Sequence, residues 1–156
     1  MTQNPACSRT AAIEALLVEA QPRLAQAYVS TRGLHGAEDA AAEAVAWGIE
    51  NSRKLEDMQN PIGYLYRVGL SRTRHRRRVR LPAPQNVGAP QVEPDLIDAL
   101  RRLPIRQRTA VWLVHGCGWT LDETAQALRV SKSTANTHCR RALERLRLEL
   151  GHEATE

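Results

Sequence analysis

The fold is decided by one stretch of sequence, Trp119-Thr120-Leu121-Asp122-Glu123-Thr124-Ala125-Gln126-Ala127-Leu128-Arg129-Val130-Ser131-Lys132-Ser133-Thr134-Ala135-Asn136-Thr137-His138-Cys139-Arg140-Arg141. It predicts a helix, a three-residue turn and a second, basic helix. Thr120 suits the N-cap of the first helix, and Glu123 completes a capping box. Ser131 suits the N-cap of the second helix. An ordinary αα-hairpin is the alternative interpretation.

The second predicted helix has the residue order of a helix that enters the major groove of DNA. Short polar side chains come first, where they can reach base edges, and arginines come later, where they can contact phosphates. The candidate DNA-contacting residues of this stretch are Thr120, Ser131, Lys132, Ser133, Thr134, Asn136, Thr137, Arg140 and Arg141.

The composition favours a small helical protein with an anionic partner. A chain of 156 residues suits one or two small domains, and 42% hydrophobic residues are enough for a core. Aromatic residues make up only 4% and Phe is absent, so the core should consist of Leu, Val and Ala between helices. The net charge is +5, and 20 of the 22 basic residues are Arg, which binds phosphates and guanine edges better than Lys. A GC-rich genome would also enrich Arg and Ala.

Other features of the sequence exclude several classes of protein. No apolar run approaches the length of a membrane span, and the N-terminus lacks the pattern of a secretory signal. Cys7, Cys117 and Cys139 have no Cys-x-x-Cys spacing, which favours a reducing cytoplasm over a disulfide framework. His115-x-Cys117 and His138-Cys139 each offer only two possible metal ligands, so they are weak indications of a metal site. Since no catalytic set stands out, we expect a cytoplasmic protein that is not an enzyme, needs no cofactor and does not insert into membranes.

Helical periodicity organises the N-terminal half. We expect helices over residues 10–31 and 37–53, separated by a break at Gly33. A third helix is expected over residues 61–78, with Asn60 as its N-cap and a proline at its first position.

A proline-rich segment over residues 81–94 follows, and its lack of periodicity predicts a linker. Beyond it we expect a short helix near 95–102, a helix that opens at Pro104, and a last helix over 132–150 after the helix-turn-helix. Neither half alternates like a strand, so the fold should be all-α with two small helical domains. The predicted division is residues 1–80, 81–93 and 94–156.

Basic residues gather in two of the predicted helices. Residues 61–80 hold seven arginines and no acid, and residues 129–147 hold six basic residues and one acid. Residues 10–60 instead hold eight acids and four bases. The alternative interpretation of the run that begins at Arg74 is a solvated helix end.

Together these motifs resemble those of the extracytoplasmic-function (ECF) group of bacterial sigma factors, over nearly the whole chain. Leu103-Pro104-Ile105-Arg106-Gln107-Arg108 resembles the start of the family's domain 4. Residues 121–134 resemble its helix-turn-helix, and Arg140-Arg141-Ala142-Leu143 its closing helix.

In the N-terminal half, Gly36-Ala37-Glu38-Asp39-Ala40-Ala41-Ala42-Glu43-Ala44 resembles the domain 2 helix that binds the β′ coiled coil of RNA polymerase. Asn60-Pro61, followed by Tyr64-Leu65-Tyr66-Arg67-Val68 and the arginine run, resembles the helix that reads the −10 promoter element. The resemblance implies polymerase contacts by Glu38, Asp39 and Glu43. It implies DNA contacts by Tyr64, Arg67, Arg72, Arg74, Arg76, Arg77 and Arg78.

Two further expectations concern individual residues. Trp47, Tyr64 and Tyr66 are candidates to stack on opened bases, with core packing as the alternative, favoured for Trp47. Arg129 stands at a turn where the family usually has Gly, and a left-handed conformation there would cost about 1 kcal/mol. Ala135 replaces a usual Val, so the packing between the two helices should be thinner.

The resemblance implies a transcription initiation factor that binds core RNA polymerase, through its β′ coiled coil and β flap, and directs it to promoter DNA. An anti-sigma factor is a further implied partner. Two alternatives stay open: a stand-alone helix-turn-helix regulator, and a degenerate sigma homologue that acts as a protein-interaction module.

Overall fold

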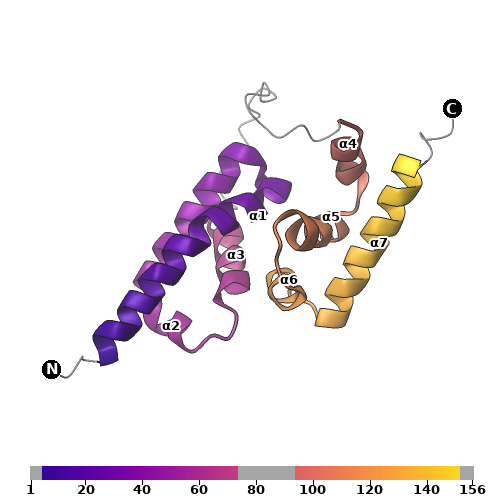
Figure 1. The fold of residues 1–156 in the computed structure, drawn as a ribbon. Helices are drawn as coiled ribbons and strands as arrows, with labels where there is room; N and C mark the ends of the chain where they lie inside the picture. Colours follow the sequence, from indigo (N-terminus) through magenta and orange to yellow (C-terminus); the bar gives the residue numbers. More distant parts are fainter. Residues whose placement is uncertain (1–4, 74–93, 152–156) are drawn as a thin grey trace.

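The computed structural model describes residues 5–73 and 94–151 of the chain. All elements within these two ranges are helical, as the sequence predicts (Figure 1). None of the described helices is both long enough and apolar enough to span a membrane. The elements are α1 (Pro5–Glu50), α2 (Ser52–Glu56), α3 (Pro61–Arg72), α4 (Pro94–Arg102), α5 (Ile105–Val111), the π-helical turn η1 (Trp112–Gly116), α6 (Leu121–Leu128) and α7 (Lys132–Gly151).

A sharp bend divides α1 into two halves. Gly33 has φ of 71° and ψ of 175°, a backbone conformation that glycine adopts without the steric cost of a Cβ. The second half folds back along the first, so that Gly48 lies against Leu17 (Figure 1). The predicted break at Gly33 is confirmed. The second half ends at Glu50, and the Asn51 side chain then donates a hydrogen bond of 3.0 Å to the Trp47 carbonyl.

The third helix is shorter than the sequence predicts. α3 begins with proline at its first position, as expected, but the Asn60 side chain makes no capping hydrogen bond. The helix ends at Arg72, and the Thr73 hydroxyl donates a hydrogen bond of 2.7 Å to the Gly69 carbonyl. The predicted DNA contacts Arg74, Arg76, Arg77 and Arg78 lie outside the described residues.

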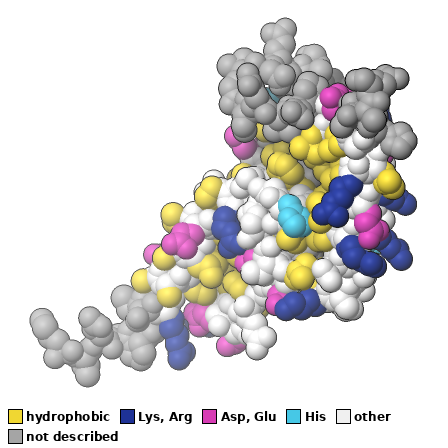
Figure 2. All heavy atoms as spheres, turned by 45° about the vertical axis from the view of Figure 1, so that its right-hand side comes forward, with side chains coloured by type: hydrophobic (Ala, Val, Ile, Leu, Met, Phe, Trp, Pro, Cys, Tyr) yellow, Lys and Arg dark blue, Asp and Glu magenta, His cyan; other side chains and the backbone are white. Residues whose placement is uncertain are grey.

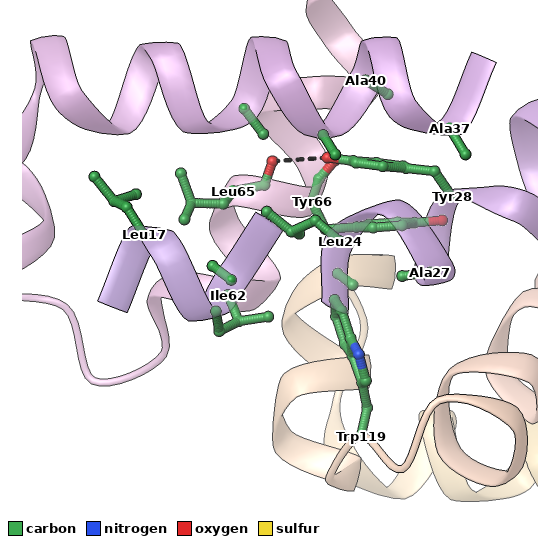
Figure 3. Close-up of a cluster of buried hydrophobic side chains, with 14 of the residues drawn as sticks. Leu17, Leu24, Ala27, Tyr28, Ala37, Ala40, Ile62, Leu65, Tyr66 and Trp119 are labelled. Atoms are coloured by element: carbon green, nitrogen blue, oxygen red, sulfur yellow. Dashed lines mark hydrogen bonds between the residues drawn. The ribbon is translucent and has the colours of Figure 1, made fainter. Parts of the chain in front are cut away.

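The core of the N-terminal half is built around two tyrosines (Figure 3). The rings of Tyr28 and Tyr66 are stacked with centroids 4.7 Å apart, and both side chains are almost fully buried. The Tyr28 hydroxyl donates to the carbonyls of Leu65 and Tyr66, at 3.0 and 2.8 Å. Burial raises the pKa of Tyr28 far above its ordinary value, so its hydroxyl remains a donor. The expectation that Tyr66 stacks on opened bases is wrong, because this ring is a core element.

The C-terminal helices have a small apolar cluster of their own between α4, α5 and α7. Ala125 on α6 and Ala135 on α7 are both buried where these helices meet, and their small side chains permit the close crossing. The cluster consists of Ala99, Leu103, Val111, Ala142 and Leu146.

A second group of C-terminal residues is buried elsewhere, in the core of the N-terminal half. Leu113, Trp119 and Ala127 belong to the same apolar cluster as Leu24 and Tyr66. The two halves of the described chain are therefore packed together through side chains. The predicted boundaries of the two domains stay a prediction.

Gly69 offers a test of the contact between α1 and α3. A Cβ built there would overlap the Tyr28 hydroxyl and lie 2.5 Å from the Ala40 carbonyl oxygen. We expect Gly69→Ala to lower the free energy of unfolding by about 1–3 kcal/mol, despite the better helix propensity of Ala. Urea denaturation followed by circular dichroism measures the change. The control is Gly151→Ala, where a Cβ meets nothing; equal stability of the two variants would contradict the packing described.

Candidate nucleic-acid interface

The first helix of the predicted helix-turn-helix is fixed by a complete capping box. The Thr120 hydroxyl accepts a hydrogen bond of 3.1 Å from the Glu123 backbone N–H. The Glu123 carboxylate in turn accepts one of 2.9 Å from the Thr120 N–H. This confirms the capping prediction and explains the start of α6, since two otherwise unpaired donors are satisfied.

The turn depends on a left-handed residue. Arg129 has φ of 56° and ψ of 47° and is the one non-glycine residue with positive φ in the described segments. This conformation directs the Val130 N–H back to the Ala125 carbonyl, at 3.0 Å, which closes the end of α6. The expected strained turn at Arg129 is confirmed.

The start of α7 is held by hydroxyl groups. The Ser131 Oγ accepts a hydrogen bond of 3.1 Å from the Thr134 N–H, which confirms its role as N-cap. The same oxygen lies 3.0 Å from the Ser133 Oγ and 2.8 Å from the Thr134 Oγ1. Lys132 forms an ion pair of 2.9 Å with Asp122 of α6. Several predicted DNA contacts thus also stabilise the start of α7, and Lys132 links it to α6.

α7 presents one face to its neighbours and another to solvent. Its buried residues lie at helical spacing, at Ala135, Cys139, Ala142 and Leu146. Asn136 and Arg141 are exposed, as are most of the other predicted contacts. Lys and Arg side chains gather on the side of the molecule that the C-terminal helices form, with some acids among them (Figure 2). Thr134 and Thr137 are half-buried, and the exposed predicted contacts are Thr120, Ser131, Lys132, Ser133, Asn136, Arg140 and Arg141.

A second basic site lies on α3. The Arg67 guanidinium lies over the Tyr64 ring, 5.1 Å from its centroid, and Tyr64 packs against Trp47 with centroids 5.3 Å apart. These three side chains line a pocket of about 240 Å³ together with Arg72 and Arg129. The pocket therefore combines aromatic faces with cations, the groups that bind single-stranded nucleic acid.

Two arginines of this pocket carry like charges close to each other. Burial lowers the pKa of Arg67 and the nearby positive charge of Arg129 lowers it further. Arg72 instead faces acids, with Glu43 at 3.7 Å and Glu50 at 3.8 Å. Because Arg67 and Arg129 are like charges that share one small space, an anionic group between them would relieve their repulsion.

The predicted polymerase contacts divide into two sets. Glu38 and Asp39 are exposed and line a shallow groove of about 500 Å³ between the two halves of α1. Small residues such as Ala25 and Ala42 form the remaining walls of this groove. Glu43 does not line it and instead pairs with Arg72. Glu38 and Asp39 thus share the groove, whereas Glu43, one helical turn after Asp39, is engaged by Arg72.

Sequence reasoning missed the contacts between the two halves. Arg23 on α1 donates to both carboxylate oxygens of Glu123, at 3.1 and 3.2 Å. Arg129 was expected only as a strained turn residue, not as part of a pocket with α3. Neither contact has a local signature, because the partners are far apart in the sequence.

Comparisons with known proteins find similar sequences for the part of the chain that contains the helix-turn-helix. Residues 94–146 match the family model described as Sigma-70, region 4. Over 54 residues the chain is 43% identical to the ECF RNA polymerase sigma factor SigM of two Mycobacterium tuberculosis strains, Erdman and H37Rv. The C-terminal part of the chain is thus similar to region 4 of the ECF sigma factors. The match to each SigM covers 35% of this chain and 28% of the relative.

A likeness in fold extends to the N-terminal half of the chain. A solved structure, the sigma factor RpoE of Bartonella quintana in complex with the anti-sigma factor NepR, superposes with a TM-score of 0.67. It covers 88% of this chain and 96% of that one, at 20% identity. The fold is therefore shared over almost the whole length.

The turn at Arg129 can be tested by relieving its strain. We expect Arg129→Gly to raise the free energy of unfolding by about 1 kcal/mol, because glycine has no Cβ to clash in the left-handed region. Thermal and urea unfolding measure the gain. Arg129→Ala is the matched control, since it removes the guanidinium but keeps the Cβ. A gain of the same size in both variants would assign the effect to charge and not to backbone strain.

Proposed function

We propose that this chain is a sigma factor that binds core RNA polymerase and directs it to promoters that carry a −35 and a −10 element. α7 would read the −35 element in the major groove, and α3 would bind the −10 element. The proposed role is that of an initiation factor, not of an enzyme.

The observation that carries the proposal is the exposed start of α7 in a completely capped helix-turn-helix. The capping box at Thr120 fixes the start of α6, and the cap at Ser131 fixes the start of α7. Asn136 projects from the exposed side of α7, one turn beyond this cap. A rigid helix with exposed polar groups at its N-terminal end is the arrangement that major-groove reading requires.

The pocket on α3 supports the second half of the proposal. Trp47 and Tyr64 offer ring faces to unpaired bases, and Arg67 offers a cation to a phosphate. The contacts proposed for Arg74, Arg76, Arg77 and Arg78 rest on sequence alone, since these residues lie outside the described ranges.

The proposed polymerase contact is the groove that Glu38 and Asp39 line on α1. Its small residues allow the close approach of a helix, and its two acids favour a basic partner. By resemblance to the family, this partner is the β′ coiled coil, and the β flap is the proposed partner of the C-terminal helices. An anti-sigma factor is a further proposed partner, because the structurally similar RpoE was solved in complex with one.

The stand-alone regulator is the second candidate, and the helix-turn-helix supports it as much as it supports the first. The acidic groove favours the sigma factor, because a regulator that works by the C-terminal helices alone has no use for it. A degenerate homologue is less favoured, since both helix caps needed for DNA reading are intact.

The deciding experiment is in vitro transcription with purified core polymerase and a library of genomic promoter fragments from the host. The proposal expects transcripts that start at a common set of promoters and depend on the added chain. DNA binding without transcripts would favour the regulator, and neither activity would favour the degenerate homologue.

Base reading by α7 is tested with two exposed residues of different chemistry. We expect Asn136→Ala to change the base preferred at one position of the −35 element, by about 1–3 kcal/mol, if its amide makes a bidentate contact to adenine. Arg141→Ala should weaken binding to all sequences alike, because a phosphate contact is blind to sequence. Selection from a randomised site measures both preferences. A uniform loss in both variants would contradict base reading by Asn136.

The polymerase contact is tested by charge reversal in the groove. We expect Glu38→Arg with Asp39→Arg to abolish capture of core polymerase, because like charges opposed at a contact cost several kcal/mol. Glu43 is left intact, since its pairing with Arg72 would confuse the result.

The matched control for the groove is Glu14→Arg with Glu19→Arg. These two exposed acids lie on the first half of α1, do not line the groove, and give the same change of charge. Pull-down of core polymerase measures capture, and circular dichroism monitors folding. Equal recovery of polymerase by the groove variant and the wild type would remove the groove from the interface.

A further inference from the structure

We propose that the pocket lined by Trp47, Tyr64, Arg67 and Arg129 is a binding site for a free nucleoside monophosphate. The two arginines would hold the phosphate, and the aromatic rings would stack on the base. This inference goes beyond the proposed function, because its ligand is a small molecule that the chain binds without polymerase and without DNA.

The two arginines come from helices far apart in the sequence. Arg67 lies on α3, and Arg129 is the C-cap of α6. α6 lies against α3 at Gly63, where a Cβ would be 2.7 Å from the Gln126 Cβ and 2.8 Å from the Glu123 carbonyl oxygen (Figure 1). Arg67 lies one helical turn after Gly63, so this close approach of the backbones places both guanidinium groups at one pocket.

Neither Arg67 nor Arg129 forms an ion pair with an acid in the described ranges. Burial lowers the pKa of Arg67, and the nearby positive charge of Arg129 lowers it further. The buried Nε of Arg67 has no hydrogen-bond partner within the part of the chain that the structure describes. Arg72, which lines the same pocket, instead pairs with Glu43 and Glu50. A dianion between Arg67 and Arg129 would neutralise both charges and accept charge-assisted hydrogen bonds.

Aromatic faces lie beside these unpaired cations. Trp47 and Tyr64 are half-buried and both line the pocket, so part of each ring stays accessible to a ligand. A cation flanks each ring, since the Lys54 ammonium lies 5.9 Å from the Trp47 ring centroid and the Arg67 guanidinium 5.1 Å from that of Tyr64. A base that stacks on such a ring gains both contact area and the attraction of the neighbouring cation.

The size and charge of the pocket favour one nucleotide over a longer polymer. Its volume of about 240 Å³ is below the roughly 300–1,000 Å³ of pockets that enclose drug-sized ligands. A terminal phosphate monoester carries a charge of about −1.5 to −2 at pH 7, which matches two arginines. Each phosphodiester of a nucleic-acid strand carries only a single negative charge and would neutralise one of them.

A bound nucleotide would have a consequence for promoter binding, and this consequence rests on the proposed function. Trp47, Tyr64 and Arg67 are the proposed contacts of the −10 strand, so a nucleoside monophosphate in the pocket would compete with that strand. The pocket would then make initiation sensitive to the concentration of the free nucleotide.

Isothermal titration calorimetry of the full-length chain with adenosine 5′-monophosphate tests the site. Adenosine lacks the phosphate and inorganic phosphate lacks the base, so these two are the matched probes. We expect each of them to bind at least about tenfold more weakly than the monophosphate, because each loses one set of contacts. Inorganic phosphate that binds as tightly as the monophosphate would overturn the stacking of the base. A wild-type chain that does not bind the monophosphate would overturn the site.

Three variants assign the binding to this pocket. Arg129→Ala removes a guanidinium, and Tyr64→Leu removes a ring face; we expect each to weaken binding of the monophosphate at least about tenfold. Arg129→Lys keeps the charge without the planar fork and should lose less. The control is Arg140→Ala, an exposed residue outside the pocket with the same change of charge as Arg129→Ala. Circular dichroism monitors folding. Equal affinity of folded Arg129→Ala and the wild type would place the ligand elsewhere and overturn the proposal.

Competition is measured separately, with a fluorescein-labelled single-stranded oligonucleotide of the −10 sequence bound to the chain. We expect adenosine 5′-monophosphate to displace it at concentrations where adenosine does not. A bound oligonucleotide that the monophosphate fails to displace would overturn the competition. If the oligonucleotide does not bind at all, the role proposed for α3 fails, and calorimetry alone decides the nucleotide site.

Discussion

The contact between Tyr28 and α3 is the interaction on which the rest of the structure depends. The Tyr28 hydroxyl donates hydrogen bonds to two carbonyls of α3, and the Tyr28 ring stacks on Tyr66. One buried side chain therefore joins α1 to α3 through packing and hydrogen bonds. Gly69 makes this approach possible, because it leaves room for the hydroxyl. Tyr66 in turn makes an edge-on ring contact with Trp119. Through Trp119 the helix-turn-helix packs against the N-terminal half.

The helix-turn-helix is instead determined almost wholly by local interactions. The caps at Thr120 and Ser131 and the left-handed turn at Arg129 each satisfy backbone groups within a few residues of themselves. Small residues at Ala125 and Ala135 then set how closely the two helices cross. Several polar side chains at the start of α7 have two tasks, since the hydroxyls that hold the helix also face the solvent where DNA would lie.

Charged pairs between the two halves of the chain act in opposite directions. Arg23 and Glu123 attract across the contact of the two halves, whereas Arg67 and Arg129 repel at its edge. The same surface therefore contains terms that close it and terms that open it. The protein is proposed to bind two separate promoter elements, so its two halves must be able to separate. A contact that combines attraction and repulsion suits this better than one that is only attractive.

The sequence by itself determined the all-α fold, the break at Gly33, the capping box, the cap at Ser131 and the strain at Arg129. All of these depend on interactions between residues close together in the chain. The tertiary structure decided that Tyr66 is a core residue and not a base-stacking one, and that Glu43 pairs with Arg72 and does not line the groove of Glu38 and Asp39. It also decided the partners of Trp119, Arg23 and Gly63. These outcomes depend on which helix faces which, and helical periodicity shows that a side chain is buried without showing against what.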